Sequence, residues 1–230
     1  MMLLKKTIVS LFKKMGLEIS KAKEDKWLSD YGIKTILDIG ANKGGFAMKI
    51  RKIIPHAKIY SFEPIKQALD NLKINLKKDS NIEFFNIGLG NKNSELEINK
   101  NEFSPSSSIL EMNSSHKINF PHTKKTLKEK IIIKRLDDII KDIDVKSKLL
   151  IKIDVQGYEK EVILGGIKTI PRADIIIVET SFVELYKKQP LFEDIYKILT
   201  KLGFKYMGSF EQIKSPLNEQ ILQQDSIFIK

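Results

Sequence analysis

The chain of 230 residues contains no cysteine, three histidines and a single tryptophan. The absence of cysteine excludes disulfides, thiolate metal sites and cysteine nucleophiles. No apolar run approaches the roughly 18 residues that a membrane-spanning helix needs. No small-residue cleavage site follows the short apolar stretch near residue 1. We therefore expect neither a transmembrane helix nor a signal peptide, and we predict a cytoplasmic protein.

Positive charge is in excess, with 40 Lys+Arg against 29 Asp+Glu and a formal net charge of +11. Such a balance favours an anionic partner such as nucleic acid, a phosphorylated sugar or a lipid headgroup. The basic residues are mostly lysines scattered singly, however, and no arginine cluster or aromatic-basic platform accompanies them. The N/D-P-P-Y/F signature of many base-modifying enzymes is also missing. We therefore predict no nucleic-acid partner.

The first 30 residues have apolar side chains at helical spacing with lysines between them. The apolar positions are Leu3, Leu4, Ile8, Leu11, Phe12 and Met15. We predict an N-terminal helical segment over 1–30 that packs on its own domain, and a domain over 31–230. The alternative for the helical stripe is weak contact with a membrane surface.

From Thr35 onward, short apolar runs alternate with helical stretches, which indicates an α/β fold with helices on both faces of a mostly parallel, Rossmann-like sheet. The predicted strands are Thr35–Ile39, Lys58–Phe62, Ile82–Ile87, Leu149–Ile153 and Ile175–Val178, followed by an edge pair at Phe204–Phe210 and Ser226–Ile229. The predicted helices are Gly45–Ile54, Pro64–Lys77, Tyr158–Gly165 and Leu191–Leu202.

A polar interval over 101–130 interrupts this alternation. It is rich in Ser, Asn, Lys and His, and strand-like segments at Glu95–Ile98 and Ile131–Arg135 flank it. Long polar segments inside a compact domain often carry binding or lid functions. We predict a polar loop or lid near the acceptor site.

The segment Ile36 to Phe46, ILDIGANKGGF, combines an apolar strand containing Asp38 with a glycine-rich turn into a helix. Ligands of open parallel sheets bind at the carboxyl ends of the strands, where glycine lets the backbone approach closely. A dinucleotide site prefers glycine at the position of Asn42, so that a pyrophosphate rests on the helix N-terminus. A carboxylate at this mouth repels a diphosphate and suits a cationic ligand, so the motif predicts S-adenosylmethionine.

Glu63 ends the next strand, about 20 residues after the glycine turn, where a carboxylate accepts hydrogen bonds from ribose hydroxyls. Pro64 follows it, at a helix start that tolerates a missing N–H. The alternative for Glu63 is an acid favoured by the helix dipole. Residues Asn86 to Gly88 end the third strand, where they either lie against an adenine or form an ordinary exit from the strand.

Four segments together resemble the FkbM family of S-adenosylmethionine-dependent methyltransferases: DIGANKGGF, FEP, RLDD at 135–138 and IKIDVQGYE at 151–159. The resemblance runs from about Thr35 to Val178. It implies the seven-stranded methyltransferase fold and O-methylation of sugars, glycans or natural products. It places the glycine loop around the methionine part of the cofactor and Glu63 at the ribose. Gln156 departs from the Glu that is common in the family. The predicted cofactor-binding set is Asp38, Gly40, Ala41, Asn42, Gly44, Phe46, Glu63, Pro64, Asn86, Ile87, Gly88 and Asp154.

Asp154 ends a buried strand, and Gly157 permits a tight turn behind it. Methyl transfer to a hydroxyl requires alignment of the acceptor and benefits from a general base. Asp154 is the candidate base, although it also suits binding of the acceptor hydroxyl or the cofactor amine. Glu179, which follows the next strand, is the second catalytic candidate. We predict no metal, because no closely spaced acidic cluster accompanies this pair.

Ser107, Ser108 and His116 lie in the polar interval and are the candidate contacts to the acceptor. The predicted function is O-methylation of a sugar, glycan or related small metabolite, with S-adenosylhomocysteine as the product. Two alternatives remain: a nucleoside-binding module without turnover, and a nicotinamide-dependent oxidoreductase. The oligomeric state cannot be inferred from the sequence.

Overall fold

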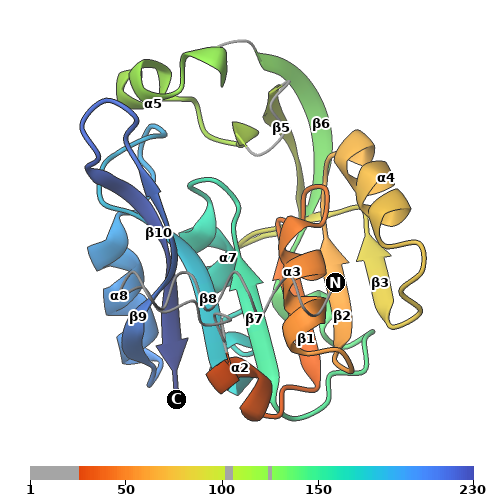
Figure 1. The fold of residues 1–230 in the computed structure, drawn as a ribbon. Helices are drawn as coiled ribbons and strands as arrows, with labels where there is room; N and C mark the ends of the chain where they lie inside the picture. The colour runs from red at the N-terminus through yellow and green to blue at the C-terminus, as the bar shows by residue number, and fades with distance from the viewer. Residues whose placement is uncertain (1–25, 102–105, 124–125) are drawn as a thin grey trace, which may run out of the picture.

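A seven-stranded sheet forms the centre of the computed structural model, which describes residues 26–101, 106–123 and 126–230 (Figure 1). The strand order is β3-β2-β1-β7-β8-β10-β9. The five strands β3, β2, β1, β7 and β8 pair in parallel, and β10 runs antiparallel to both of its neighbours, β8 and β9. The bounds are β1 Thr35–Ile39, β2 Lys58–Phe62, β3 Ile82–Phe85, β7 Leu149–Ile153, β8 Ile175–Ser181, β9 Lys205–Lys214 and β10 Ile221–Ile229. The predicted Rossmann-like, mostly parallel sheet is confirmed.

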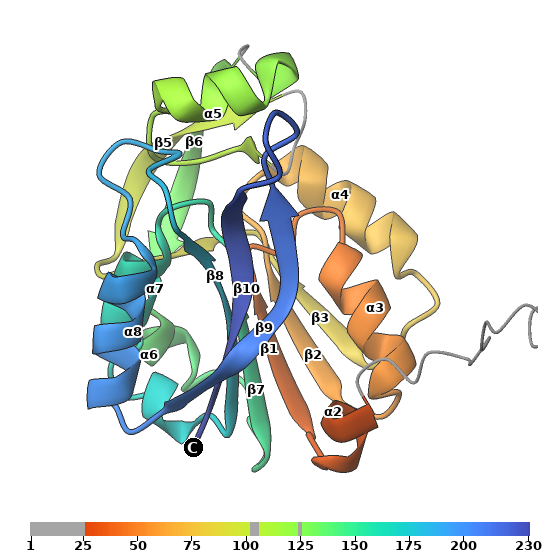
Figure 2. The same cartoon turned by 60° about the vertical axis from the view of Figure 1, so that its left-hand side comes forward.

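Helices cover both faces of this sheet, as Figure 2 shows. Apolar side chains of α2 (Lys26–Asp30), α3 (Gly45–Ile53) and α4 (Lys66–Asn75) share one buried cluster with alternate residues of the strands. Those of α6 (Leu136–Ile139), α7 (Glu159–Gly165), α8 (Phe192–Lys201) and the 3-10 helix η3 (Ile170–Arg172) share the other. Because successive strand residues point to opposite faces, each strand supplies both clusters.

A second sheet stands beyond the carboxyl ends of the main strands. It contains β4 (Gly88–Leu89), β5 (Ser94–Asn101) and β6 (Thr126–Lys134) in the order β4-β6-β5, with β6 parallel to β4 and antiparallel to β5. Its inner face packs on the start of α4 through a small apolar cluster of Ile65, Ala68, Ile98, Ile131 and Ile133. This sheet therefore forms a wall opposite the strand ends at which ligands of such folds bind.

Two sequence predictions need correction here. The strand from Ile82 ends at Phe85 and not at residue 87, because the Asn86 amide turns to donate to the carbonyl oxygens of Glu63 and Pro64, at 3.0 and 2.9 Å. The polar interval is not a plain loop. It contains helix α5 (Ser114–Asn119) and the 3-10 helix η2 (Pro121–Thr123), and β6 begins at Thr126, ahead of the predicted Ile131.

Of the predicted N-terminal helical segment, only α2 lies within the described part of the chain. Residues 1–25, and with them the apolar stripe and its membrane-contact alternative, lie outside it. Across the ranges that the structure does describe, no helix is long and apolar enough to cross a membrane.

Candidate active site

A cavity of about 460 Å³ lies between the carboxyl ends of β1, β2, β7 and β8 and the second sheet. Its size is in the range of small-molecule sites. The predicted site residues that line it are Gly40, Asn42, Glu63, Pro64, Gly88, Ser107, His116, Asp154 and Glu179. The fold therefore brings the glycine loop after β1 and the Asp154 turn after β7 together in the same cavity.

The glycine loop after β1 approaches the turn after β7 so closely that only glycine fits at residue 40. Gly40 has a φ of 83°, and a Cβ at this position would lie 1.8 Å from the carbonyl oxygen of Asp154. The N–H groups of Gly40 and Ala41 both donate to the carbonyl oxygen of Phe62, at 3.0 Å. Asn42 takes a left-handed conformation with a φ of 48°. The loop is thus fixed from two sides, and its backbone forms the floor of the cavity.

Glu63 holds this loop to the next helix. One oxygen of its carboxylate accepts a hydrogen bond from the N–H of Asn42, and the other accepts one from the N–H of Ile65, both at 2.8 Å. Burial raises the pKa of Glu63 to about 7, although these two hydrogen bonds favour the ionised form. Each carboxylate oxygen keeps a further lone pair for a ligand hydroxyl.

Several other predicted cofactor residues do not line the cavity. Asp38 lies beneath the loop, where its carboxylate is 3.4 Å from the Ser61 hydroxyl, and burial raises its pKa to about 7 against the opposing charge of Lys152. Ala41 and Phe46 belong to the apolar cluster under α3. The remaining members outside the lining are Gly44, Asn86 and Ile87.

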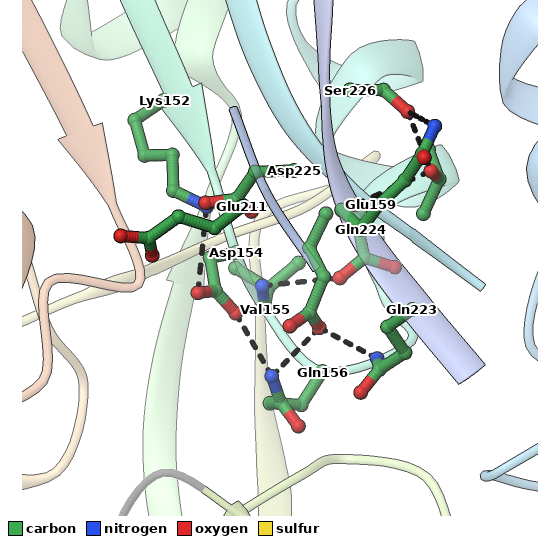
Figure 3. Close-up of polar contacts among 12 residues, drawn as sticks. Lys152, Asp154, Val155, Gln156, Glu159, Glu211, Gln223, Gln224, Asp225 and Ser226 are labelled. Atoms are coloured by element: carbon green, nitrogen blue, oxygen red, sulfur yellow. Dashed lines mark hydrogen bonds and ion pairs between the residues drawn. The ribbon is translucent and has the colours of Figure 1, made fainter. Parts of the chain in front are cut away.

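Asp154 and Glu179 face the cavity and are bridged by one amide. The Gln156 side-chain nitrogen donates to Asp154 Oδ1 at 2.9 Å and to Glu179 Oε2 at 2.7 Å (Figure 3). The Gln223 amide also donates to Glu179 Oε2, at 2.9 Å, and the Tyr186 hydroxyl donates to Gln156 Oε1 at 2.8 Å. Burial, reinforced by the nearby acids, raises the pKa of Glu179 well above its ordinary value. The environment of Glu179 therefore favours its protonated form.

The turn that carries Gln156 is strained and held in place. Gln156 and Gly157 both have positive φ, at 54° and 96°. Glu159 Oε1 accepts the N–H groups of Val155 at 3.1 Å and Gly157 at 3.0 Å, and the Ser108 hydroxyl donates to the Gln156 carbonyl oxygen at 2.6 Å. Burial raises the pKa of Glu159 to about 7. Ser108, predicted as an acceptor contact, thus supports this turn from outside the cavity lining.

Ser107 and His116 do line the cavity, on the side of the polar interval. The Ser107 hydroxyl accepts the Asn101 N–H at 2.9 Å, and His116 Nε2 lies 3.1 Å from the Thr123 hydroxyl. The imidazole packs between two rings, with centroid distances of 5.2 Å to Phe120 and 5.1 Å to Tyr186. Residues of the interval between 106 and 120 therefore supply one wall of the cavity.

Sequence reasoning missed the residues that support the acids, namely Lys152, Tyr186, Gln223 and Asp225. A signal existed for Lys152, because a lysine in the middle of an otherwise apolar strand is unusual. The others gave none, because their places depend on how the last strands fold back. Within ranges 26–101, 106–123 and 126–230, no group of three or more His, Asp or Glu residues is arranged to hold a metal ion.

Comparisons with known proteins and family models show which family the chain belongs to. A putative RNA methyltransferase from Pyrococcus horikoshii superposes with a TM-score of 0.48 at 15% identity, over 89% of this chain and 77% of that one. The 2-O-methyltransferase NoeI of Sinorhizobium fredii is 29% identical over 182 residues, which are 76% of this chain and 74% of that protein. Methyltransferase sdnD of Sordaria araneosa is 26% identical over 192 residues, 74% of this chain and 73% of its own length. The model of the methyltransferase FkbM domain matches residues 38–206. The chain therefore belongs to the FkbM family of methyltransferases.

Proposed function

We propose that this methyltransferase uses S-adenosylmethionine to methylate a hydroxyl group of a sugar, glycan or related small metabolite. The observation that carries the proposal is one cavity that brings together two chemically different groups of residues. The glycine loop and Glu63 form one group, and the acids Asp154 and Glu179 form the other. The 2-O-methyltransferase NoeI, by its name, methylates oxygen, which supports the choice of a hydroxyl acceptor.

The glycine loop, Glu63 and the residues beside it fit a sulfonium nucleoside. Gly40 and Asn42 offer close backbone, the Glu63 carboxylate keeps lone pairs for the two ribose hydroxyls, and Pro64 and Gly88 border an apolar space for a base. The cavity acids disfavour a diphosphate, which argues against a nicotinamide dinucleotide. When bound, S-adenosylmethionine supplies a methyl group on a positively charged sulfur.

The two acids Asp154 and Glu179 have different roles in the reaction that we propose. Asp154 accepts the proton of the acceptor hydroxyl, which makes the oxygen a better nucleophile. Burial raises the pKa of Glu179, which favours its protonated form, and both of its amide partners donate to Oε2. In the protonated form, its own O–H is available to hold the acceptor. Two carboxyl groups in different environments are a common way to separate a base from a neutral hydrogen-bond donor.

One wall of the cavity is mostly apolar. Ile98 and Ile131 of the second sheet and Ile109 of the polar interval line the cavity beside Ser107 and His116. An acceptor that fits this wall has an apolar face or substituent next to the hydroxyl that reacts. We assign the interval 101–130 to acceptor binding, with Ser107 and His116 as the contacts.

Methyl transfer from tritiated S-adenosylmethionine to a panel of p-nitrophenyl glycosides and to fractionated cell glycans tests the proposal. The matched pair of variants is Asp154→Asn and Asp70→Asn, because Asp70 is an exposed acid on α4 paired with Lys66. We expect label transfer by the wild type and by Asp70→Asn. Asp154→Asn should lose about 100-fold or more in rate while calorimetry still detects binding of S-adenosylmethionine.

Three other outcomes would contradict parts of the proposal. Equal rates for Asp154→Asn and the wild type would show that Asp154 is not the base. Tight binding of S-adenosylmethionine with no labelled acceptor favours the nucleoside-binding module. Binding of a nicotinamide dinucleotide in place of S-adenosylmethionine favours the oxidoreductase.

A further inference from the structure

A row of ionisable side chains crosses the main sheet behind the cavity. Each of these side chains lies two positions along its strand from a residue of the apolar cluster under α3, so all four point to the α3 face of the sheet. They are Asp38 on β1, Lys152 on β7, Glu179 on β8 and Asp225 on β10. The strand register pairs Asp38 with Lys152, and Glu179 with Asp225. A single ammonium group thus lies among three carboxyl groups of the sheet, next to a fourth on Asp154.

Lys152 connects the acid of the last strand with the acid of the cavity. Its ammonium nitrogen lies 2.7 Å from Asp225 Oδ1 and 3.5 Å from Asp154 Oδ2, as Figure 3 shows. The Lys152 side chain is only 4% exposed and does not line the cavity, whereas Asp154 does. Lys152 therefore acts on a ligand only indirectly, and Asp154 is the cavity side chain with which it forms an ion pair.

The two oxygens of Asp154 have different partners. Oδ2 faces the Lys152 ammonium, and Oδ1 accepts from the Gln156 amide at 2.9 Å. Donors on both oxygens fix the plane of the carboxylate. We infer that Lys152 and Asp225 form a positioning pair, through which the C-terminal strand sets the charge and direction of the Asp154 carboxylate. The inference rests on the proposed function for the role of Asp154, and Asp225 lies beyond the residues that the family model matches.

The charges around Lys152 are consistent with this role. Burial alone would lower the pKa of Lys152, but the carboxylates of Asp154, Asp225 and Glu179 raise it above its ordinary value. The ammonium in turn opposes the upward pKa shifts that burial gives Asp38, Glu179 and Asp225. Lys152 thus remains a cation and is shared among the acids.

One further acid reaches this group from β9. Glu211 adds to the upward pKa shift of Asp225, although it is 61% exposed and pairs with Lys49 of α3 at 2.6 Å. Asp225 is therefore the partly buried acid that competes with Asp154 for the ammonium, and the more exposed Glu211 offers a matched acid for comparison.

The pair makes opposite predictions for its two members. Lys152→Met removes the positive charge beside Asp154, so the carboxylate ionises at higher pH. Asp225→Asn removes the acid that lies nearest to the ammonium in the structure, so the Asp154 carboxylate ionises at lower pH. An opposite charge within about 4–6 Å shifts the ionisation of an aspartate by about 1–3 pH units.

Carbon-13 NMR of the aspartate carboxyl groups in the full-length protein without cofactor measures this directly, with Asp154→Asn used to assign the signal. We expect the titration midpoint of Asp154 to rise by about 1–3 pH units in Lys152→Met and to fall in Asp225→Asn. Glu211→Gln should leave it unchanged. Midpoints that stay fixed, or that move in the same direction in both variants, would overturn the inference.

Two further measurements keep the test decisive. If Lys152→Met alone fails to fold, the double variant Lys152→Met/Asp225→Asn removes both members of the pair, and its midpoint should lie above that of Asp225→Asn alone. With the glycoside panel, Asp225→Asn should lower kcat and move the acid limb of the pH profile downward, with KM for S-adenosylmethionine unchanged. A wild type that methylates nothing would refute the proposed function, whereas the NMR midpoints would still judge the pair.

Discussion

Proton release on cofactor binding gives a quantitative test of Glu63. Its pKa is about 7 in the free protein, so at pH 6.5 roughly three quarters of the molecules carry a protonated Glu63. A ligand whose ribose hydroxyls donate to the carboxylate favours the ionised form. Binding at this pH should therefore release about 0.8 protons from Glu63.

The ligand itself contributes little to this count. Its amino group, with an ordinary pKa of about 7.7–8.0, is protonated at pH 6.5, and its carboxyl group, near 3.5, is ionised. Asp38 is the second protein group with a pKa of about 7, and it adds protons if the cation of the ligand favours its ionisation. Each pH unit below 7 should weaken binding by up to about tenfold for each such group, or about 1.4 kcal/mol.

Calorimetry in buffers of different ionisation enthalpy counts the released protons. We expect about 0.8 to 1.5 protons in the wild type at pH 6.5, and about 0.8 fewer in Glu63→Gln. Glu83→Gln is the matched control, because Glu83 is an acid on β3 that is 51% exposed and paired with Lys58. Equal proton release in Glu63→Gln and the wild type would refute the assignment of Glu63 to the ribose.

Two stability predictions follow from the same loops. Gly40→Ala should lower the free energy of unfolding in urea by about 3 kcal/mol or more, because of its positive φ and the backbone oxygen 1.8 Å from the new Cβ. Gly45→Ala, with nothing within 4 Å, should change it by less than about 1 kcal/mol; similar losses would contradict the close approach. The raised pKa of Glu159, about 7, means that the folded state binds more protons, so stability falls as pH rises from about 4.5 to 7. Glu159→Gln should flatten this fall by up to about 3 kcal/mol, and an unchanged slope would contradict the buried position.

The main sheet could be predicted from sequence because its central strands are covered on both faces. Such strands are short apolar runs between helices, and β1, β2 and β7 have the predicted bounds. The glycine loop could also be predicted from the sequence, because the close approach of Gly40 to the next turn permits only glycine at that position. Local backbone chemistry therefore indicated where the cavity lies.

The second sheet could not be predicted in the same way. Its strand β4 is Gly88–Leu89 alone, too short for any periodicity, and β5 is a half-exposed strand that pairs with a segment across the whole polar interval. Pairing between distant segments depends on the rest of the fold, whereas propensity describes only neighbours. The cavity wall made by this sheet therefore emerged only from the structure.

The polar support of the acids illustrates the same limit. Lys152 and Asp225 are 73 positions apart, and their contact exists because β10 inserts between β8 and β9. No spacing rule connects a lysine of one strand with an aspartate of an antiparallel strand inserted from the tail. The sequence indicated the acid that faces the cavity, but not the pair behind it.

The buried acids explain how this site can favour a cationic ligand. Glu63, Asp38 and Glu179 all have pKa values raised by burial, which means that their ionised forms are unfavourable in the free protein. A positive charge in the cavity offsets this cost, so a cationic methyl donor should bind more strongly than its neutral product. Among the described residues, Lys152 supplies positive charge next to Asp38 and Glu179, but its side chain does not line the cavity. The positive charge of a sulfonium ligand in the cavity would favour the ionised acids further, whereas the negative charge of a diphosphate would oppose their ionisation.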